Sequence, residues 1–133
     1  VTLDIDICAV CLPWLMCLYV EILPLETAMR IWDVLFTEGH CAVLIRVALT
    51  FFHLLHDDIL ACTNSGELLI LFAQSPSHML DCDSLIRLAH EPLSYVSPAQ
   101  VDEMRAKYRK PLEKEFLRSL KYLHQRQQQN SKK

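Results

Sequence analysis

The sequence predicts an all-α fold of about five to seven helices, and three observations support this class. Only 2 of the 133 residues are glycine, too few for the many tight turns of an all-β protein. Hydrophobic residues make up 52% of the chain and charged residues 22%, so there is enough apolar surface for a folded core. Apolar residues also recur every three or four positions in several segments, as they do along a helix with one buried face.

The first predicted helix begins at a cap residue, Asp4 or Asp6, and runs to about Ile22, with a kink or break at Pro13. Apolar side chains surround its axis, so we expect it to be buried. Its longest uncharged apolar run covers residues 7–20, which is shorter than the roughly 20 residues that span a bilayer. A secretory signal is not expected, because no basic region precedes this run.

Two residues mark the ends of the second predicted helix: Pro24 suits its first position, and Gly39 suits the position after its end. Polar side chains occupy one face of this helix, and apolar side chains occupy the other with the i, i+3, i+4, i+7 spacing. Trp32 is on the apolar face, where we expect its large ring to join the first helix to the third.

A third helix is predicted over residues 41–56. Apolar residues cover most of its circumference, so we expect it to be the central helix of the fold. Its polar residues form a narrow stripe that consists of Arg46, Thr50 and His53.

Two shorter helices are predicted next. Residues 64–66 read Asn-Ser-Gly and predict a turn before a helix over residues 67–73, which ends near a Ser-Pro pair. Asp81 or Asp83 is a suitable cap for another helix that continues through His90.

The C-terminal part is predicted to form one long charged helix. A capping box over residues 97–100 begins it, and we expect an interruption or kink near Pro111 and an end at about Leu123. Residues 124–133 are rich in glutamine and end in lysines, so they are expected to be disordered. The predicted organisation is therefore a helical domain over residues 1–123 and a polar tail.

Charge is distributed unevenly along the chain. Residues 1–104 contain 3 Lys/Arg and 14 Asp/Glu, whereas residues 105–133 contain 10 Lys/Arg and 2 Asp/Glu. A membrane surface, a nucleic acid or the acidic part of the chain itself are the partners that suit such a basic end. The acidic Glu113 and Glu115 and the apolar spacing favour packing on the domain. No nucleic-acid partner is expected, and peripheral membrane contact is kept as an alternative.

Two groups of residues have side chains of the kinds that bind metal ions. Cys8 and Cys11 have CxxC spacing, but no second pair accompanies them, and we expect the six cysteines to be free cytosolic thiols. His53 and His56 precede a pair of aspartates, which gives a ligand set at helical spacing. Histidines at the C-terminus of a helix also interact favourably with the helix dipole. We therefore expect neither a metal nor a cofactor.

The second helix carries a motif. Residues 23–39 resemble the L-P-x-E-T-x-x-R-x-W-D…E-G motif of the TBC family, the helical domain of Rab GTPase-activating proteins, and the resemblance extends over about residues 1–90. This resemblance implies that the chain is the C-terminal part of a TBC domain. It also implies a scaffold role for the matching residues, which are Leu23, Pro24, Glu26, Thr27, Arg30, Trp32, Asp33, Glu38 and Gly39.

The spacing of three charged residues in this motif predicts ion pairs independently of the family. Glu26 and Arg30 are four positions apart, and Arg30 and Asp33 are three apart, so the three side chains share one face of a helix as a charge network.

The resemblance implies a GTP-loaded Rab as partner, together with an arginine finger and a glutamine finger that act on the nucleotide. In the family these fingers come from I-x-x-D-x-x-R and Y-x-Q motifs upstream of the matched segment. None of the four tyrosines here is followed by Gln at the second position, and Asp102-x-x-Arg105 lies downstream and lacks the Ile. We therefore expect no catalytic residue in this chain, and we expect Arg30 to pair with Asp33 instead of acting as a finger.

The leading hypothesis is a fragment of a Rab GTPase-activating protein of vesicle trafficking, a regulator and not an enzyme, which is inactive alone. It would be cytoplasmic or peripheral on endomembranes. The alternative is a catalytically silent helical module for protein interaction. A partial domain exposes apolar surface, so we expect the isolated chain to aggregate or to form oligomers.

Overall fold

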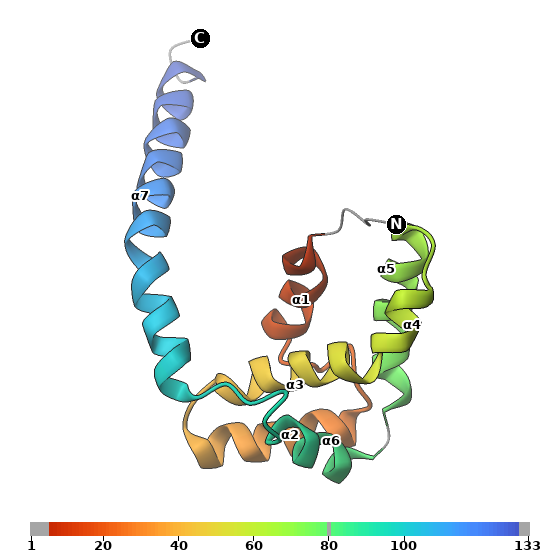
Figure 1. The fold of residues 1–133 in the computed structure, drawn as a ribbon. Coiled ribbons are helices and arrows are strands. Elements are labelled where there is room, and N and C mark those ends of the chain that lie inside the picture. The colour runs from red at the N-terminus through yellow and green to blue at the C-terminus, as the bar shows by residue number, and fades with distance from the viewer. Residues whose placement is uncertain (1–5, 80, 131–133) are drawn as a thin grey trace. The chain divides into compact units, whose positions relative to one another are not determined.

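The computed structural model describes residues 6–79 and 81–130, except for the side chains of residue 123 and of residues 125–130. Over these residues the fold is all-helical, which confirms the predicted class. The chain divides into two compact units, Val1–Pro98 and Ala99–Lys133. The helices of both are drawn in Figure 1.

The first unit holds six α-helices and one 3₁₀ helix within the described residues. They are α1 (Ile7–Met16), α2 (Leu25–Glu38), α3 (Ala42–Leu54), α4 (His56–Ala61), α5 (Ser65–Gln74), η1 (Ser75–His78) and α6 (Cys82–Ala89).

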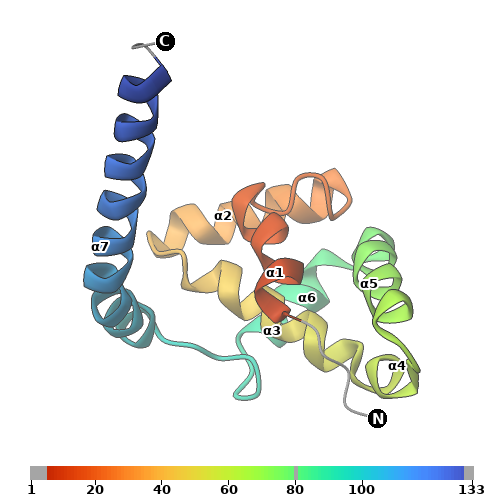
Figure 2. The same ribbon diagram turned by 90° about the horizontal axis from the view of Figure 1, so that it is seen from above.

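Helix α3 is the central element of this unit, as its apolar circumference predicted. It contacts α1, α2, α4 and α6, and Figure 1 shows it with α1 on one side and α2 and α6 on the other. In Figure 2 α1 lies over α3. Two of the three residues of its predicted polar stripe, Arg46 and Thr50, are buried. Thr50 donates to the carbonyl oxygen of Arg46 in the same helix at 2.9 Å, whereas the buried charge of Arg46 requires partners from other elements.

Aromatic side chains from three helices form the middle of the core. The ring of Trp14 in α1 lies 5.8 Å from that of Phe51 and 6.1 Å from that of Phe52, both in α3. It also lies 5.9 Å from the ring of Phe72 in α5. These edge-to-face and tilted arrangements are favourable for aromatic pairs, so Trp14 joins α1, α3 and α5.

The end of α1 differs from the prediction. The helix ends at Met16 and not at Ile22, because the chain turns back through Leu18 and Tyr19, whose φ angles are 49° and 67°. Such left-handed backbone is strained for residues other than glycine. The turn places the buried Tyr19 hydroxyl where it donates to the carbonyl oxygen of Leu44 at 2.8 Å. No glycine or asparagine marks this turn in the sequence.

The predicted position of Trp32 is also wrong. Its side chain is half-buried and outside the core cluster, and its indole Nε1 donates to the carbonyl oxygen of Leu18 at 2.9 Å. Trp32 therefore fixes the strained turn against α2, while Trp14 performs the joining role that we expected of Trp32.

Helix α2 follows the prediction closely. It begins at Leu25, with Pro24 as its N-cap residue instead of its first helical residue. It ends at Gly39, whose φ of 65° and backbone hydrogen bond to the carbonyl of Leu35 form a left-handed C-cap.

Two boundaries beyond α3 were not predicted correctly. The segment predicted as a single helix divides at Leu55, and α4 follows as a separate short helix. Asn64, predicted as a turn residue, is the N-cap of α5 and accepts a hydrogen bond from the backbone N–H of Glu67 at 3.0 Å. Glu67 in turn accepts from the backbone N–H of Thr63 at 2.8 Å, which is a reciprocal capping arrangement.

The second unit consists of the long helix α7 (Pro98–Asn130), which begins with the last residue of the first unit. The helix is continuous through Pro111, so the predicted interruption is wrong. It also extends past Leu123 into the segment predicted to be disordered; residues 131–133 lie outside the described residues. None of the described helices is long and apolar enough to cross a membrane.

The left-handed cap of α2 leads to a stability prediction. The substitution Gly39→Ala should lower the free energy of unfolding by about 1–2 kcal/mol, because any Cβ is strained at this backbone conformation. Space is not the reason, since an added Cβ would meet nothing within 4 Å. Urea denaturation of the two proteins measures the difference.

Gly66→Ala is the matched control. Gly66 is helical, and its added Cβ would lie 3.2 Å from the side-chain oxygen of Asn64. The Gly66→Ala substitution requires no left-handed backbone, and alanine has the higher helix propensity. Gly66→Ala should therefore lower the free energy of unfolding by less than Gly39→Ala does. Equal losses in the two variants would contradict the capping role of Gly39.

Candidate functional site

Polar side chains of α2 connect the motif helix to other segments of the first unit. The buried Thr27 donates its hydroxyl to the carbonyl oxygen of Met79, just after η1, at 2.8 Å. Arg30 Nε lies 3.3 Å from Asp83 Oδ1 in α6. Together with the bond from Trp32 to the turn after α1, these contacts place residues of the motif against three different segments.

The predicted charge network on this helix is present only in part. Arg30 pairs with Asp33, with 3.9 Å between Nη1 and Oδ2. Its stronger partner is Asp83, a residue of another helix. Among the described residues no ion pair joins Arg30 to Glu26. The face of α2 that carries Arg30 thus contributes to the contact between α2 and α6.

The nonpolar motif residues have packing and backbone roles. Leu23 is buried in the core cluster, Pro24 caps the start of α2, and Gly39 caps its end.

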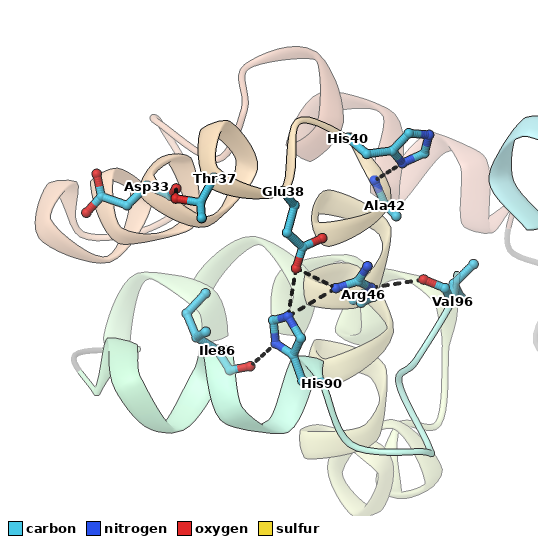
Figure 3. A network of polar contacts seen from close by, with 9 residues as sticks. All are labelled: Asp33, Thr37, Glu38, His40, Ala42, Arg46, Ile86, His90 and Val96. Atoms are coloured by element: carbon cyan, nitrogen blue, oxygen red, sulfur yellow. Dashed lines mark hydrogen bonds and ion pairs between the residues drawn. The ribbon is translucent and has the colours of Figure 1, made fainter. Parts of the chain in front are cut away.

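Among the described residues of the first unit the most buried charge is Arg46 in α3, with a side chain that is 3% exposed. Its Nη1 donates to Glu38 Oε1, at the end of α2, at 2.9 Å. Its Nε donates to the carbonyl oxygen of Val96 at 2.9 Å. Figure 3 shows this guanidinium between its two acceptors. Tyr95 covers it, with its ring centroid 4.9 Å from Cζ.

His90, at the end of α6, completes the network. Its Nε2 lies 2.8 Å from Glu38 Oε1 and 3.1 Å from Arg46 Nη1, and its Nδ1 lies 2.8 Å from the carbonyl oxygen of Ile86. Both ring nitrogens therefore face an acceptor (Figure 3). One carboxylate oxygen, Oε1 of Glu38, thus brings together the ends of α2 and α6 and the middle of α3.

The environment of Glu38 changes its acidity. Burial raises the pKa of the carboxyl, but the hydrogen bonds and positive charges of Arg46 and His90 outweigh burial and hold the pKa below its ordinary value. The carboxylate is consequently the stable form of Glu38 within this network.

One feature of the sequence, the charge of Arg46, indicates this site but does not identify all of its partners. Arg46 is the single Asp, Glu, Lys or Arg in a mostly apolar helix, and a buried charge has to be paired. Glu38, named from the motif, is one partner. His90 and Val96 lie 44 and 50 residues further along the chain, and nothing in their sequence context indicated a link to Arg46.

The residues considered as metal ligands do not assemble into a metal site in the described structure. His53, His56 and the two aspartates after them are exposed, and His56 Nδ1 contacts Asp57 Oδ1 at 3.1 Å. No group of three or more ligand-type side chains lies together within residues 6–79 and 81–130. Cys8 and Cys11 are free thiols. Burial, and to a smaller extent the nearby Cys8, raises the pKa of Cys11. The raised pKa disfavours the thiolate, which is the form that binds metals.

The chemistry of the site is that of a closed network. In the described residues every buried side-chain nitrogen and oxygen atom has a hydrogen-bond partner. The polar motif residues thus find most of their partners in other segments, and these contacts fix α2 against α3 and α6.

Similarity to known proteins gives the family. The model of the Rab-GTPase-TBC domain family matches residues 2–60, which include the whole motif helix. The chain belongs to this family. No solved structure gives a significant match.

Three relatives illustrate the extent of the match. The human "Growth hormone-regulated TBC protein 1" is 35% identical over 94 residues, which are 69% of this chain and 28% of that protein. Its Xenopus laevis counterpart is 35% identical over 104 residues, 77% of this chain and 30% of that protein. The human "Small G protein signaling modulator 3" is 26% identical over 105 residues, 79% of this chain and 14% of that protein. The chain thus spans less than a third of the length of each relative.

The buried position of Arg46 leads to a second prediction. Arg46→Met should lower the free energy of unfolding by about 2–4 kcal/mol, because it leaves the partly buried Glu38 carboxylate and the Val96 carbonyl without their donor. Arg87→Met is the control, since Arg87 is exposed and pairs with Glu91 at 3.6 Å. The control should change stability by no more than about 0.5 kcal/mol. If denaturant titrations give similar losses of unfolding free energy for Arg46→Met and Arg87→Met, burial of the Arg46 ion pair does not determine its contribution to stability.

The lowered pKa of Glu38 predicts a dependence of stability on pH. A carboxyl whose folded-state pKa is depressed stabilises the fold above its unfolded pKa of about 4.3, and this contribution is lost as the pH falls through the folded-state value. The contribution of Glu38 should therefore be present at neutral pH and disappear in the acid range. Glu38→Gln should flatten the decline in unfolding free energy between neutral and acid pH. An unchanged pH profile in this variant would contradict the assignment.

Proposed function

We propose that this chain is the scaffold part of a Rab GTPase-activating TBC domain, with both catalytic fingers supplied by residues upstream of it. It is a regulator of GTP hydrolysis and has no active site of its own. The complete domain binds a GTP-loaded Rab-type GTPase and acts in vesicle trafficking, in the cytoplasm or at the cytoplasmic surface of endomembranes.

One observation carries this proposal: each of the three arginines in residues 6–98 is already in an ion pair. Arg30 pairs with Asp83 and Asp33, Arg46 with Glu38, and Arg87 with Glu91, at the distances given above. An arginine finger has to extend freely from the domain to the transferring phosphoryl group. Arg46 is excluded by its burial, and Arg30 is held between two aspartates.

The surface of α1 supports the view that more of the domain precedes this segment. Ile7, Leu12 and Met16 of α1 are all exposed, and Met16 is 76% exposed. Apolar side chains gathered on one short helix favour coverage by another part of a protein. In the proposed domain this cover is the upstream half. The isolated chain should accordingly associate or aggregate, and a stable monomer in sedimentation experiments would count against this view.

A GTPase assay tests the proposal. The chain alone should not accelerate phosphate release from any member of a panel of GTP-loaded Rab proteins, whereas a natural sequence extended upstream through the I-x-x-D-x-x-R and Y-x-Q motifs should accelerate it by about 10³-fold or more on its cognate Rab. Activity in the short chain would overturn the assignment of roles.

Two variants of the longer protein act as internal controls. Replacing the upstream finger arginine by alanine should abolish the acceleration, while Arg87→Ala should leave it within about two-fold, because an exposed pair contributes little. If the longer protein binds a Rab but gives no acceleration, the alternative of a catalytically silent interaction module is correct.

A further inference from the structure

Helix α7 carries an apolar stripe that its own unit leaves uncovered. Met104, Tyr108, Leu112, Phe116 and Leu120 follow one another at intervals of four residues, and their exposed fractions lie between 45% and 64%. Residues four apart are neighbours on one side of a helix, so these side chains form a continuous stripe that is about 24 Å long.

The opposite side of the same helix is basic. Lys107, Lys110, Lys114, Arg118 and Lys121 are spaced by three or four residues, so they share a second face. Lys110 and Lys114 are each two residues from Leu112, which places them about 200° around the axis from it.

Four of these five basic side chains are available for a partner, and the fifth, Lys107, has its Nζ 5.4 Å from the centroid of the Tyr108 ring. The ion pairs of the described part of α7 use other arginines: Arg105 lies 3.9 Å from Asp102, and Arg109 lies 3.8 Å from Glu113. The side chains of Lys110, Lys114, Arg118 and Lys121 are exposed and have no ion pair in the described residues.

An anionic lipid surface is the partner that uses both faces at once. A second copy of α7 would cover the stripe, but residues 99–133 contain 10 Lys/Arg and 4 Asp/Glu, so two such helices repel each other. An acidic protein would neutralise the basic face and leave the stripe in water. A membrane interface accepts the stripe at the boundary of the acyl chains, while long cationic side chains reach the anionic headgroups.

We propose that α7 lies in the plane of an anionic membrane surface, with the stripe from Met104 to Leu120 inserted and the basic face bound to headgroup phosphates and carboxylates. This inference deepens the proposed peripheral location and specifies the chemistry of the surface. It does not depend on the assignment of GTPase activation, because that assay uses proteins without membranes.

Vesicle co-sedimentation of the full chain tests this proposal. The chain should bind vesicles of phosphatidylcholine with about 30% phosphatidylserine at least about 10-fold more tightly than vesicles of phosphatidylcholine alone, and salt should weaken the binding. Equal binding to both vesicle types, or no binding to either, would overturn it.

Matched substitutions separate the two faces. Leu112→Ser with Phe116→Ser should reduce binding about 10-fold or more, since two apolar side chains leave the acyl boundary. Leu117→Ser is the control, because Leu117 is equally apolar and exposed but lies outside the stripe. Lys110→Gln with Lys114→Gln should weaken binding to the anionic vesicles, while the corresponding change to arginine should not.

Circular dichroism checks that each variant retains its helix. If the stripe variant binds like the unchanged chain, the basic face acts alone and an acidic macromolecule becomes the better partner. If, without vesicles, the stripe variant converts a dimer into a monomer in sedimentation velocity experiments, the stripe is covered by a second copy. Either result would refute the membrane proposal.

Discussion

The buried guanidinium of Arg46 is the constraint on which the first unit depends. A charge in the middle of a core helix is unfavourable unless acceptors surround it, and here they come from the end of α2 and from the segment after α6. His90 binds the same carboxylate from α6. The ends of α2 and α6 are therefore positioned against α3 by one charged group, and apolar packing around Trp14 forms the middle of the core.

The motif of the family has a structural explanation in this network. Thr27, Arg30, Trp32 and Glu38 each contact a segment other than α2, while Pro24 and Gly39 define where the helix begins and ends. Such residues are interdependent, because each fixes the distance or direction of α2 relative to a different neighbour. This mutual dependence supports the proposed role of the chain as the scaffold part of the domain.

The two units differ in how they use apolar residues. The first unit buries Trp14, Tyr19, Phe51 and Phe72 in one core. Its strained turn at Leu18 and Tyr19 is held by a buried hydroxyl and an indole. The single helix of the second unit has no core of its own. Nothing in that helix covers its exposed apolar stripe, whereas water solvates its exposed basic side chains.

The sequence by itself determined the helical class, the limits of α2 and the family, because residue spacing, a proline and a glycine are local signals. It also indicated that α3 is central, since its apolar residues surround the axis. Only the tertiary structure decided that α1 ends at Met16, that Trp14 and not Trp32 fills the core, and that Arg46 binds Glu38, His90 and Val96. These features rest on contacts between residues far apart in the chain, and local spacing contains no information about such contacts.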